Sequence, residues 1–363
     1  MDELFYQIAL RQSNYIGDIT AKHLYNHFGS AQAVFGAKQS EITQVVGVGE
    51  VAANSILSQQ SFHIAEREMN FIQKNKVQTF FYKDAAYPKR LQRIEGAPFL
   101  LFFQGNADFN LSQVLAVVGT RKPTEVGKRN CEQLLAGIKE YKPLIVSGLA
   151  YGVDICAHKK ALALGLPTIG VVAHGLDMIY PAIHQPIAAQ MLENGGILTE
   201  FITQTEPNPQ NFPMRNRVIA GMSDAVVVVE TARAGGSIIT AELANDYQKD
   251  VFAIPGRLED EFSQGCNWLI KTHKASLLES WEDLVYVLRW DKLTEHKAQQ
   301  VQLFPELSSE ETKIVDILRG GQVHLDLLVR NSGMSVSKLA SILLDLEFKA
   351  IVKPLAGKNY ILC

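Results

Sequence analysis

The sequence is poor in cysteine and has no long apolar run. Four cysteines occur among 363 residues, far apart and without a Cys-x-x-Cys pair: Cys131, Cys156, Cys266 and Cys363. This spacing disfavours a zinc knuckle or a disulfide framework, and it fits a reducing compartment. No stretch approaches the roughly 20 apolar residues of a membrane span, and no basic segment leads into an apolar one at the N-terminus. We therefore expect a cytoplasmic protein with no metal site and no membrane partner.

Neither basic nor acidic residues are in large excess. The 35 Lys and Arg residues nearly balance 38 Asp and Glu residues, for a net charge of -3. This balance excludes a globally basic nucleic-acid binder but leaves room for a local basic patch. The Gly-x-Gly-x-x-Gly and Walker phosphate-binding patterns are absent as well, so we expect no cofactor. The length predicts two to three domains at about 150 residues each.

Residues 1–70 read as a small helical domain of the SAM or helix-hairpin-helix kind. Residues 45–56 (VVGVGEVAANSI) have the form of a glycine turn that opens a helix, and residues 16–24 (IGDITAKHL) are a weaker copy. Such turns can aim backbone N–H groups at a phosphate. Alternatively, the glycines only let two helices pack closely, and the acids Asp18 and Glu50 on the turns favour this second interpretation.

Residues 76–290 alternate apolar, β-rich runs with segments of helical length. The runs include VLAVV, LIVSG, TIGVVA, GILTE, DAVVVVE and VFAIP. Strands that are covered on both faces of a parallel sheet read as continuous apolar runs of this kind. The sequence therefore predicts an α/β fold with a doubly wound, mostly parallel sheet.

The end of the chain reads as a separate module. Residues 291–304 are polar and are interpreted as a linker. Residues 305–363 then give helix, a turn with Gly333, helix and two short strands, which is the order of a winged helix-turn-helix.

Small and basic residues follow three of the predicted strands. They are Gly119, Thr120, Arg121 and Lys122 after the first strand, Ser147 and Gly148 after the second, and Gly235, Gly236 and Ser237 after a later one. Ligands of open α/β sheets bind at the carboxyl ends of the strands. Because glycine lets an oxyanion approach the backbone and helix N-termini favour negative charge, these loops predict a phosphate-binding crevice.

A second cluster lies between two later strands. Phe212, Arg215, Asn216 and Arg217 combine a stacking ring with two cations, a combination typical of sequence-tolerant single-strand binding. Alternatively, this is a helix start in which Phe212 joins the core and both arginines are solvated. Asp154 and His158 are interpreted as structural, because no partner nucleophile accompanies them.

Together these motifs resemble the DNA processing protein A (DprA/Smf) family of bacteria. The resemblance rests on GTR at 119–121, SGLAYGVDICAH at 147–158, YP at 180–181, FPMRNRVIAG at 212–221, GGS at 235–237, PG at 255–256 and GCNWLI at 265–270. It implies an extended Rossmann-like domain that binds single-stranded DNA, forms a homodimer and loads the RecA recombinase during natural transformation. It also implies that the residues of both clusters line the DNA-binding pocket and that Phe212 stacks on a base.

The sequence departs from the family pattern at two positions. Tyr151 stands where the family often has arginine, which removes a phosphate contact and offers a stacking surface instead. Lys274 stands where glycine is frequent, so the local turn differs.

Two other functions remain as alternatives. The stretch around residues 224–242 also resembles lysine-decarboxylase-like nucleotide phosphoribohydrolases, in which Glu242 would assist catalysis. A winged-helix regulator would place duplex recognition in the tail, but its second helix offers only Lys338 as a base. A non-catalytic DNA-binding protein is the prediction that the residues favour.

Overall fold

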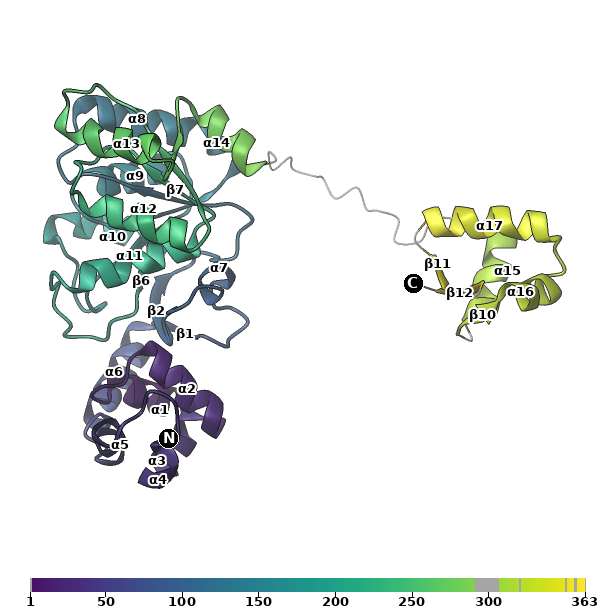
Figure 1. The fold of residues 1–363 in the computed structure, drawn as a ribbon, viewed down its shortest axis with the longest axis horizontal. Coiled ribbons are helices and arrows are strands. Elements are labelled where there is room, and N and C mark those ends of the chain that lie inside the picture. The colour runs from purple at the N-terminus through teal and green to yellow at the C-terminus, as the bar shows by residue number, and fades with distance from the viewer. Residues whose placement is uncertain (1, 291–306, 320, 350, 356–357, 363) are drawn as a thin grey trace. The chain divides into compact units, whose positions relative to one another are not determined.

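The structure is a computed structural model. It describes residues 2–290, 307–319, 321–349, 351–355 and 358–362. The chain divides into two compact units, Met1–Leu293 and Thr294–Cys363 (Figure 1). The predicted linker at 291–304 lies outside the described residues, and the finer division into four segments stays a prediction.

The first unit begins with a set of helices, as the sequence predicts. They are α1 (Glu3–Gln12), α2 (Asp18–Phe28), α3 (Ala31–Gly36), α4 (Gln39–Ile42), α5 (Glu50–Leu57) and α6 (Phe62–Asn75). Their apolar faces bury Ile8, Leu24 and Ile56 in a core that continues onto Phe81 and Phe99 beside the sheet. The N-terminal helices therefore share one core with the first strands and are fixed to them.

The glycine turn before α5 has the local geometry that the sequence predicts. Gly47 has a φ of +86°, a left-handed conformation in which a side chain would be strained, while an added Cβ would meet only Thr20 at 3.9 Å. The glycine is therefore needed for the turn rather than for close helix packing at this position. Gly49 is the N-cap of α5.

A nine-stranded sheet follows, with the spatial order β1-β2-β6-β5-β4-β3-β7-β8-β9. The strands are β1 (Gln78–Phe81), β2 (Leu100–Gly105), β3 (Val114–Val118), β4 (Leu144–Ser147), β5 (Thr168–Val171), β6 (Gly195–Thr199), β7 (Ala225–Val228), β8 (Asp250–Ala253) and β9 (Ser276–Leu277). The strands from β6 to β9 in this order pair in parallel, whereas β1 and β2 pair antiparallel. This confirms the predicted fold class.

Helices cover both faces of the sheet. They are α7 (Lys89–Gln92), α8 (Glu125–Gly137), α9 (Val153–Ala163), α10 (Gln185–Met191), α11 (Asn211–Met222), α12 (Gly236–Asp246), α13 (Glu261–Lys271) and α14 (Trp281–Leu288), with short 3-10 turns at Lys139–Tyr141 and Ala182–His184. Alternate residues of β3 point to opposite faces: Ala116 packs with α11 to α13, and Leu115 packs with α8, α9 and α14. Burial on both faces explains the continuous apolar runs in the sequence.

The order of the strands creates a switch point beside β3. The chain proceeds from β3 through β4 and β5 to β6 on one side, and then returns to place β7 on the other side of β3. The loops that leave β3 and β7 therefore diverge at the carboxyl edge, where a crevice forms in doubly wound sheets.

The second unit has the predicted order of a winged helix. Its elements are α15 (Ser309–Leu318), β10 (Val323–His324), α16 (Leu325–Ser332), α17 (Val336–Phe348), β11 (Val352–Leu355) and β12 (Asn359–Leu362). The strands form a small antiparallel sheet in the order β10-β12-β11. Over the described residues of both units, no helix combines the length and the apolar character that crossing a membrane requires.

Candidate nucleic-acid interface

A cavity of about 310 Å³ lies at the switch point, where β3 and β7 end. Residues of both predicted clusters line it: Gly119, Thr120, Arg121, Phe212, Arg215, Asn216, Gly235, Gly236 and Ser237. The fold therefore brings together segments that are more than a hundred residues apart in the sequence, because their strands are neighbours at this edge.

Two cations and an aromatic ring form one wall of the cavity. The guanidinium carbon of Arg121 lies 5.3 Å from the centroid of the Phe212 ring, and that of Arg215 lies 5.8 Å from it. These distances are within the range of favourable cation–π contacts. Arg121 is exposed, whereas Arg215 is only 5% exposed. The wall therefore combines one mobile surface cation with one fixed cation.

Arg215 is held in place by the loop after β4 and the end of β5. Its Nη1 donates hydrogen bonds to the carbonyl oxygens of Gly148 and Val171. Burial lowers the pKa of Arg215 to about 10, so the side chain remains a cation at neutral pH. An added Cβ at Gly148 would lie 2.7 Å from the guanidinium, which explains why glycine occupies this position.

The contacts of Asp154 and His158 are structural, as the sequence analysis favours, and Asp154 also lines the cavity. The buried carboxylate of Asp154 accepts hydrogen bonds from the N–H groups of Gly148 at 3.1 Å and Ala150 at 3.4 Å, which shapes the loop after β4. Burial raises the pKa of Asp154 while Arg215 opposes the rise. His158 contacts Thr168 at 2.7 Å, and burial lowers its pKa to about 3, so its ring is neutral and has no access to the cavity.

The N-terminus of α12 forms the opposite wall. Its first turn carries N–H groups without partners inside the helix, which favours an anion there. The Ser237 side chain is 7% exposed, and within the described part of the chain its hydroxyl has no hydrogen-bond partner. Gly235 is required for close packing, since an added Cβ would meet the Thr231 hydroxyl at 2.2 Å. This wall suits a phosphate oxygen.

Four of the predicted site residues do not line this cavity: Lys122, Ser147, Gly148 and Arg217. Lys122 lies on the exposed loop after Arg121, and its N–H contacts the Thr120 hydroxyl at 3.2 Å. Ser147 is fully buried, and its hydroxyl donates to the carbonyl of Val117 at 2.6 Å. Gly148 lines a smaller neighbouring cavity instead.

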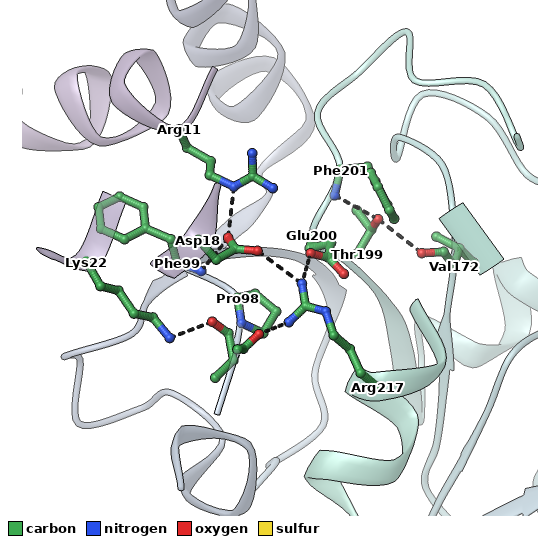
Figure 2. A network of polar contacts seen from close by, with 12 residues as sticks. Arg11, Asp18, Lys22, Pro98, Phe99, Val172, Thr199, Glu200, Phe201 and Arg217 are labelled. Atoms are coloured by element: carbon green, nitrogen blue, oxygen red, sulfur yellow. Dashed lines mark hydrogen bonds and ion pairs between the residues drawn. The ribbon is translucent and has the colours of Figure 1, made fainter. Parts of the chain in front are cut away.

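Arg217 lies in a polar network between the N-terminal helices and the sheet domain (Figure 2). Its guanidinium donates to the carbonyl of Gly96 and to the carboxylates of Asp18, at 3.1 Å, and Glu200. Arg11 contacts the same Asp18 at 2.8 Å. The expectation that Arg217 lines the pocket together with Arg215 has a geometric obstacle: residues two apart on a helix point in nearly opposite directions. That spacing was the signal in the sequence that separates them.

The network has an uneven charge balance. Burial opposes ionisation of Asp18, but Arg11 and Arg217 outweigh it and lower the pKa of that carboxyl. Burial raises the pKa of Glu200 to about 7, although Arg217 opposes the rise. Among the described residues, one carboxylate oxygen of Glu200 has no hydrogen-bond partner.

Exposed aromatic side chains lie beside the cavity. The smaller cavity, of about 50 Å³, adjoins the first through Arg121, Phe212 and Arg215, and Tyr151 and Tyr180 also line it. Tyr151 is 48% exposed and Tyr180 is 43% exposed. The N–H of Tyr180 donates to the His174 ring at 3.1 Å, so the backbone beside the exposed Tyr180 ring is anchored.

Several lining residues have no distinctive sequence signal. Ala150, Thr231, Ala232 and Phe262 also line the larger cavity. They are small or apolar residues, which sequence reasoning assigns to turns and cores. Their common signal is position, since each lies in or directly after a loop at the carboxyl edge.

The residues that the alternative functions need are placed elsewhere. Glu242 lies on α12 and pairs with Lys274 at 2.6 Å, and it does not line the cavity. Lys338 on α17 pairs with Glu310. The geometry therefore gives no support to Glu242 as a catalytic group or to Lys338 as a free base for duplex DNA.

Comparison with known proteins agrees with the resemblance seen in the motifs. The family model described as DNA recombination-mediator protein A matches residues 78–289, and the DprA winged helix domain matches residues 298–358. Protein Smf of Escherichia coli (strain K12) is 34% identical over 283 residues, which cover 75% of this chain and 74% of that protein. DNA processing protein DprA of Streptococcus pneumoniae is 39% identical over 210 residues, which cover 58% of this chain and 74% of that protein.

Solved structures give the same result. The X-ray structure of DprA from Streptococcus pneumoniae matches with a TM-score of 0.70 and 32% identity, covering 79% of this chain and 98% of that one. DNA processing protein A from Helicobacter pylori, whose structure concerns its single-stranded DNA binding mode, matches with a TM-score of 0.54 and 29% identity, covering 59% and 96%. From its motifs, its sheet and its winged helix, the chain belongs to the DNA processing protein A (DprA/Smf) family.

Proposed function

We propose that this protein binds single-stranded DNA at the switch-point cavity and, as a homodimer in the cytoplasm, protects incoming DNA and loads the RecA recombinase onto it in natural transformation and homologous recombination. The observation that carries the DNA-binding part is the meeting of Arg121, Arg215, Phe212 and the N-terminus of α12 around one cavity. No catalytic step is proposed for these residues.

The chemistry of the cavity fits a nucleotide strand. The fixed guanidinium of Arg215 and the N-terminus of α12 attract phosphate from two sides. Phe212 offers a face on which any base can stack, which makes binding tolerant of sequence. Such a site needs no cofactor, because it performs no bond-making step.

The role with RecA and the homodimer depend on family membership. The matched family model is described as a recombination mediator, and the Helicobacter pylori relative has a single-stranded DNA binding mode. A mediator that holds the phosphate backbone leaves most bases accessible to a recombinase. A pull-down of RecA with the DNA-bound protein tests this part separately from DNA binding.

The test of DNA binding is fluorescence anisotropy with labelled oligo-dT and a duplex of the same length at several salt concentrations. We expect preferential, salt-sensitive binding of the single strand. Arg121→Ala removes one phosphate contact, so the slope of log affinity against log salt falls by about 0.7. A fourfold rise in salt then weakens the wild type roughly 2.6 times more than the variant.

The matched control is Lys139→Ala. Lys139 is exposed and begins the 3-10 turn Lys139–Tyr141, which lies before β4 and therefore at the amino end of that strand, whereas the cavity lies at the carboxyl ends of the strands. This variant removes the same charge but no proposed contact, so its salt slope equals that of the wild type. Equal slopes for Arg121→Ala and Lys139→Ala would remove Arg121 from the interface, and preference for duplex would refute the proposal.

A contact role for proteins is proposed for the C-terminal unit. Along α17, Val336, Leu344 and Phe348 are 58%, 52% and 83% exposed. Exposed apolar side chains on this helix are suited to contact with another protein. Contact with a DNA backbone would instead require exposed cations.

A further inference from the structure

A second aromatic side chain with cations around it lies on α13, outside the cavity. The Arg233 guanidinium carbon lies 6.0 Å from the centroid of the Trp268 ring, and the Lys274 ammonium lies 4.8 Å from it. Trp268 is half-buried and packs with one side against the core beneath α12 and α13. The ring is therefore held rigidly while part of it faces solvent, as at the Phe212 wall.

The helix that carries Trp268 packs directly against a loop that lines the cavity. Gly265, one helical turn before Trp268, donates its N–H to the carbonyl of Thr231 at 2.9 Å. An added Cβ at Gly265 would lie 2.5 Å from that oxygen and 2.6 Å from the carbonyl of Ala232, so helix and loop touch directly. Thr231 and Ala232 line the cavity, and Arg233 is the next residue along the chain. The loop thus leads from the cavity wall to the tryptophan.

The charges near α13 favour one direction for an anionic strand. Glu259, Asp260 and Glu261 precede or open the helix and outnumber the exposed Arg257 next to them, so this end of the helix repels phosphate. Arg233 is exposed and directly follows Ala232, which lines the cavity, and Lys271 is exposed at the last turn of the helix. Lys274 lies beyond that turn and is partly neutralised by Glu242 at 2.6 Å. A strand leaving the cavity past Arg233 therefore moves away from the acids and toward the lysines.

We propose that Trp268 and Arg233 form a second nucleotide-binding position on the path of single-stranded DNA, next to the switch-point cavity. The proposal rests on the proposed function, which it extends from one cavity to a continuous track. A base stacks on the exposed part of the Trp268 ring, and Arg233, displaced from the ring, binds the neighbouring phosphate. Stacking on an aromatic side chain is tolerant of sequence, so the track accepts any strand.

The test uses the full-length chain and oligo-dT of about twelve nucleotides, which falls within the range of single-strand site sizes. The chain has three tryptophans, and Trp281 and Trp290 belong to the apolar cluster around α14 on the other face of the sheet. We expect oligo-dT to quench the tryptophan fluorescence of the wild type and of the control variant Trp281→Phe. Trp268→Phe loses most of this quenching.

Affinity is measured in parallel by anisotropy. Trp268→Ala lowers the affinity roughly tenfold, within the range for loss of one stacked base. Arg233→Ala lowers the salt slope by about 0.7, as for any lost phosphate contact, and Arg233→Lys restores it. Since Arg233 is exposed, its variants test the track without disturbing the core.

The outcomes separate this inference from the proposed function. The second position is refuted, and the cavity is not, if the wild type binds DNA but Trp268→Phe keeps the quenching of the wild type. The same conclusion follows if Arg233→Ala keeps the affinity and salt slope of the wild type. Absence of any anisotropy change with the wild type would refute the DNA-binding function and the track with it. Loss of quenching together with a lower slope supports the track.

Discussion

Substitution of Arg217 separates a structural role from a DNA-binding role. In the network of Figure 2, the Glu200 side chain is 3% exposed and is an ion-pair partner of Arg217. Arg217→Met keeps much of the side chain's length but removes the guanidinium. Asp18 retains Arg11 at 2.8 Å, whereas Glu200 loses the cation that favours its ionised form. We expect the variant to be less stable, and increasingly so at alkaline pH.

The magnitude follows from linkage between protonation and folding. In the wild type, the pKa of Glu200 is raised from 4.5 to about 7, so the folded state binds the extra proton in this window. Stability therefore falls by about 1.4 kcal/mol per pH unit from pH 4.5 to 7, roughly 3 kcal/mol in total, and is then level. Without Arg217 the pKa rises further, so the fall continues above pH 7. Above pH 7 the variant therefore loses up to about 1.4 kcal/mol per pH unit more than the wild type.

The measurement is urea unfolding followed by circular dichroism at about pH 5.5, 7 and 8.5. A constant loss of roughly 1 to 2 kcal/mol is expected at every pH from the broken hydrogen bonds, including that to Gly96. In the Arg217→Met background, Glu200→Gln removes the titrating group and thus the extra loss above pH 7. Parallel stability profiles for the wild type and Arg217→Met in that range would refute the reasoning. Loss of DNA affinity without loss of stability would return Arg217 to the binding surface.

Three further outcomes are expected. Gly152→Ala destabilises the protein by about 1 to 3 kcal/mol and weakens oligo-dT binding, because φ is +84° and an added Cβ would meet the carbonyl of Thr120 at 2.2 Å. Thermal unfolding measures the first effect and anisotropy the second, and wild-type values in both would contradict this account. A chain ending at residue 293 retains its affinity for oligo-dT within a factor of about three, since charge at the exposed face of α17 is sparse; a larger loss in anisotropy would assign strand contacts to the C-terminal unit. In the folded protein the His158 ring, with its pKa lowered to about 3, stays neutral, while in the unfolded chain it protonates below about pH 6.5. The free energy of unfolding therefore falls in acid, and it falls less in His158→Leu. If NMR shows this ring titrating above pH 5 in the folded protein, the reasoning is wrong.

Much of the fold follows from local sequence pattern. The apolar runs at Val114–Val118 and Ala225–Val228 read as buried strands because each is covered on both faces. The spatial order of the strands does not follow from local pattern, because the pairing of β3 with β7 joins segments that are more than a hundred residues apart. Pattern predicts that the sheet is doubly wound, but the position of the switch point comes from the structure.

The site was predictable where backbone geometry alone places a residue. Arg121 and Gly235 follow strands directly, so strand-end reasoning brings them to one edge. For Arg217, composition suggested a phosphate contact, but the helical angle between positions 215 and 217 and the distant Asp18 decide its place. Trp268 lies on a helix, and the packing of Gly265 against Thr231, which connects this helix to the cavity loop, has no signal in the sequence.

The two arginines of α11 give one helix two functions that depend on each other. Arg215 extends toward the sheet edge and holds the Gly148 carbonyl at the cavity, whereas Arg217 extends toward the N-terminal helices and holds Asp18. Because the two arginines are two residues apart on one helix, the contacts of Arg217 with Asp18 help to fix the backbone from which Arg215 reaches the cavity. Under the proposed function, we therefore expect the N-terminal helices to influence binding through this anchor, which lies two residues from Arg215, without contacting DNA themselves.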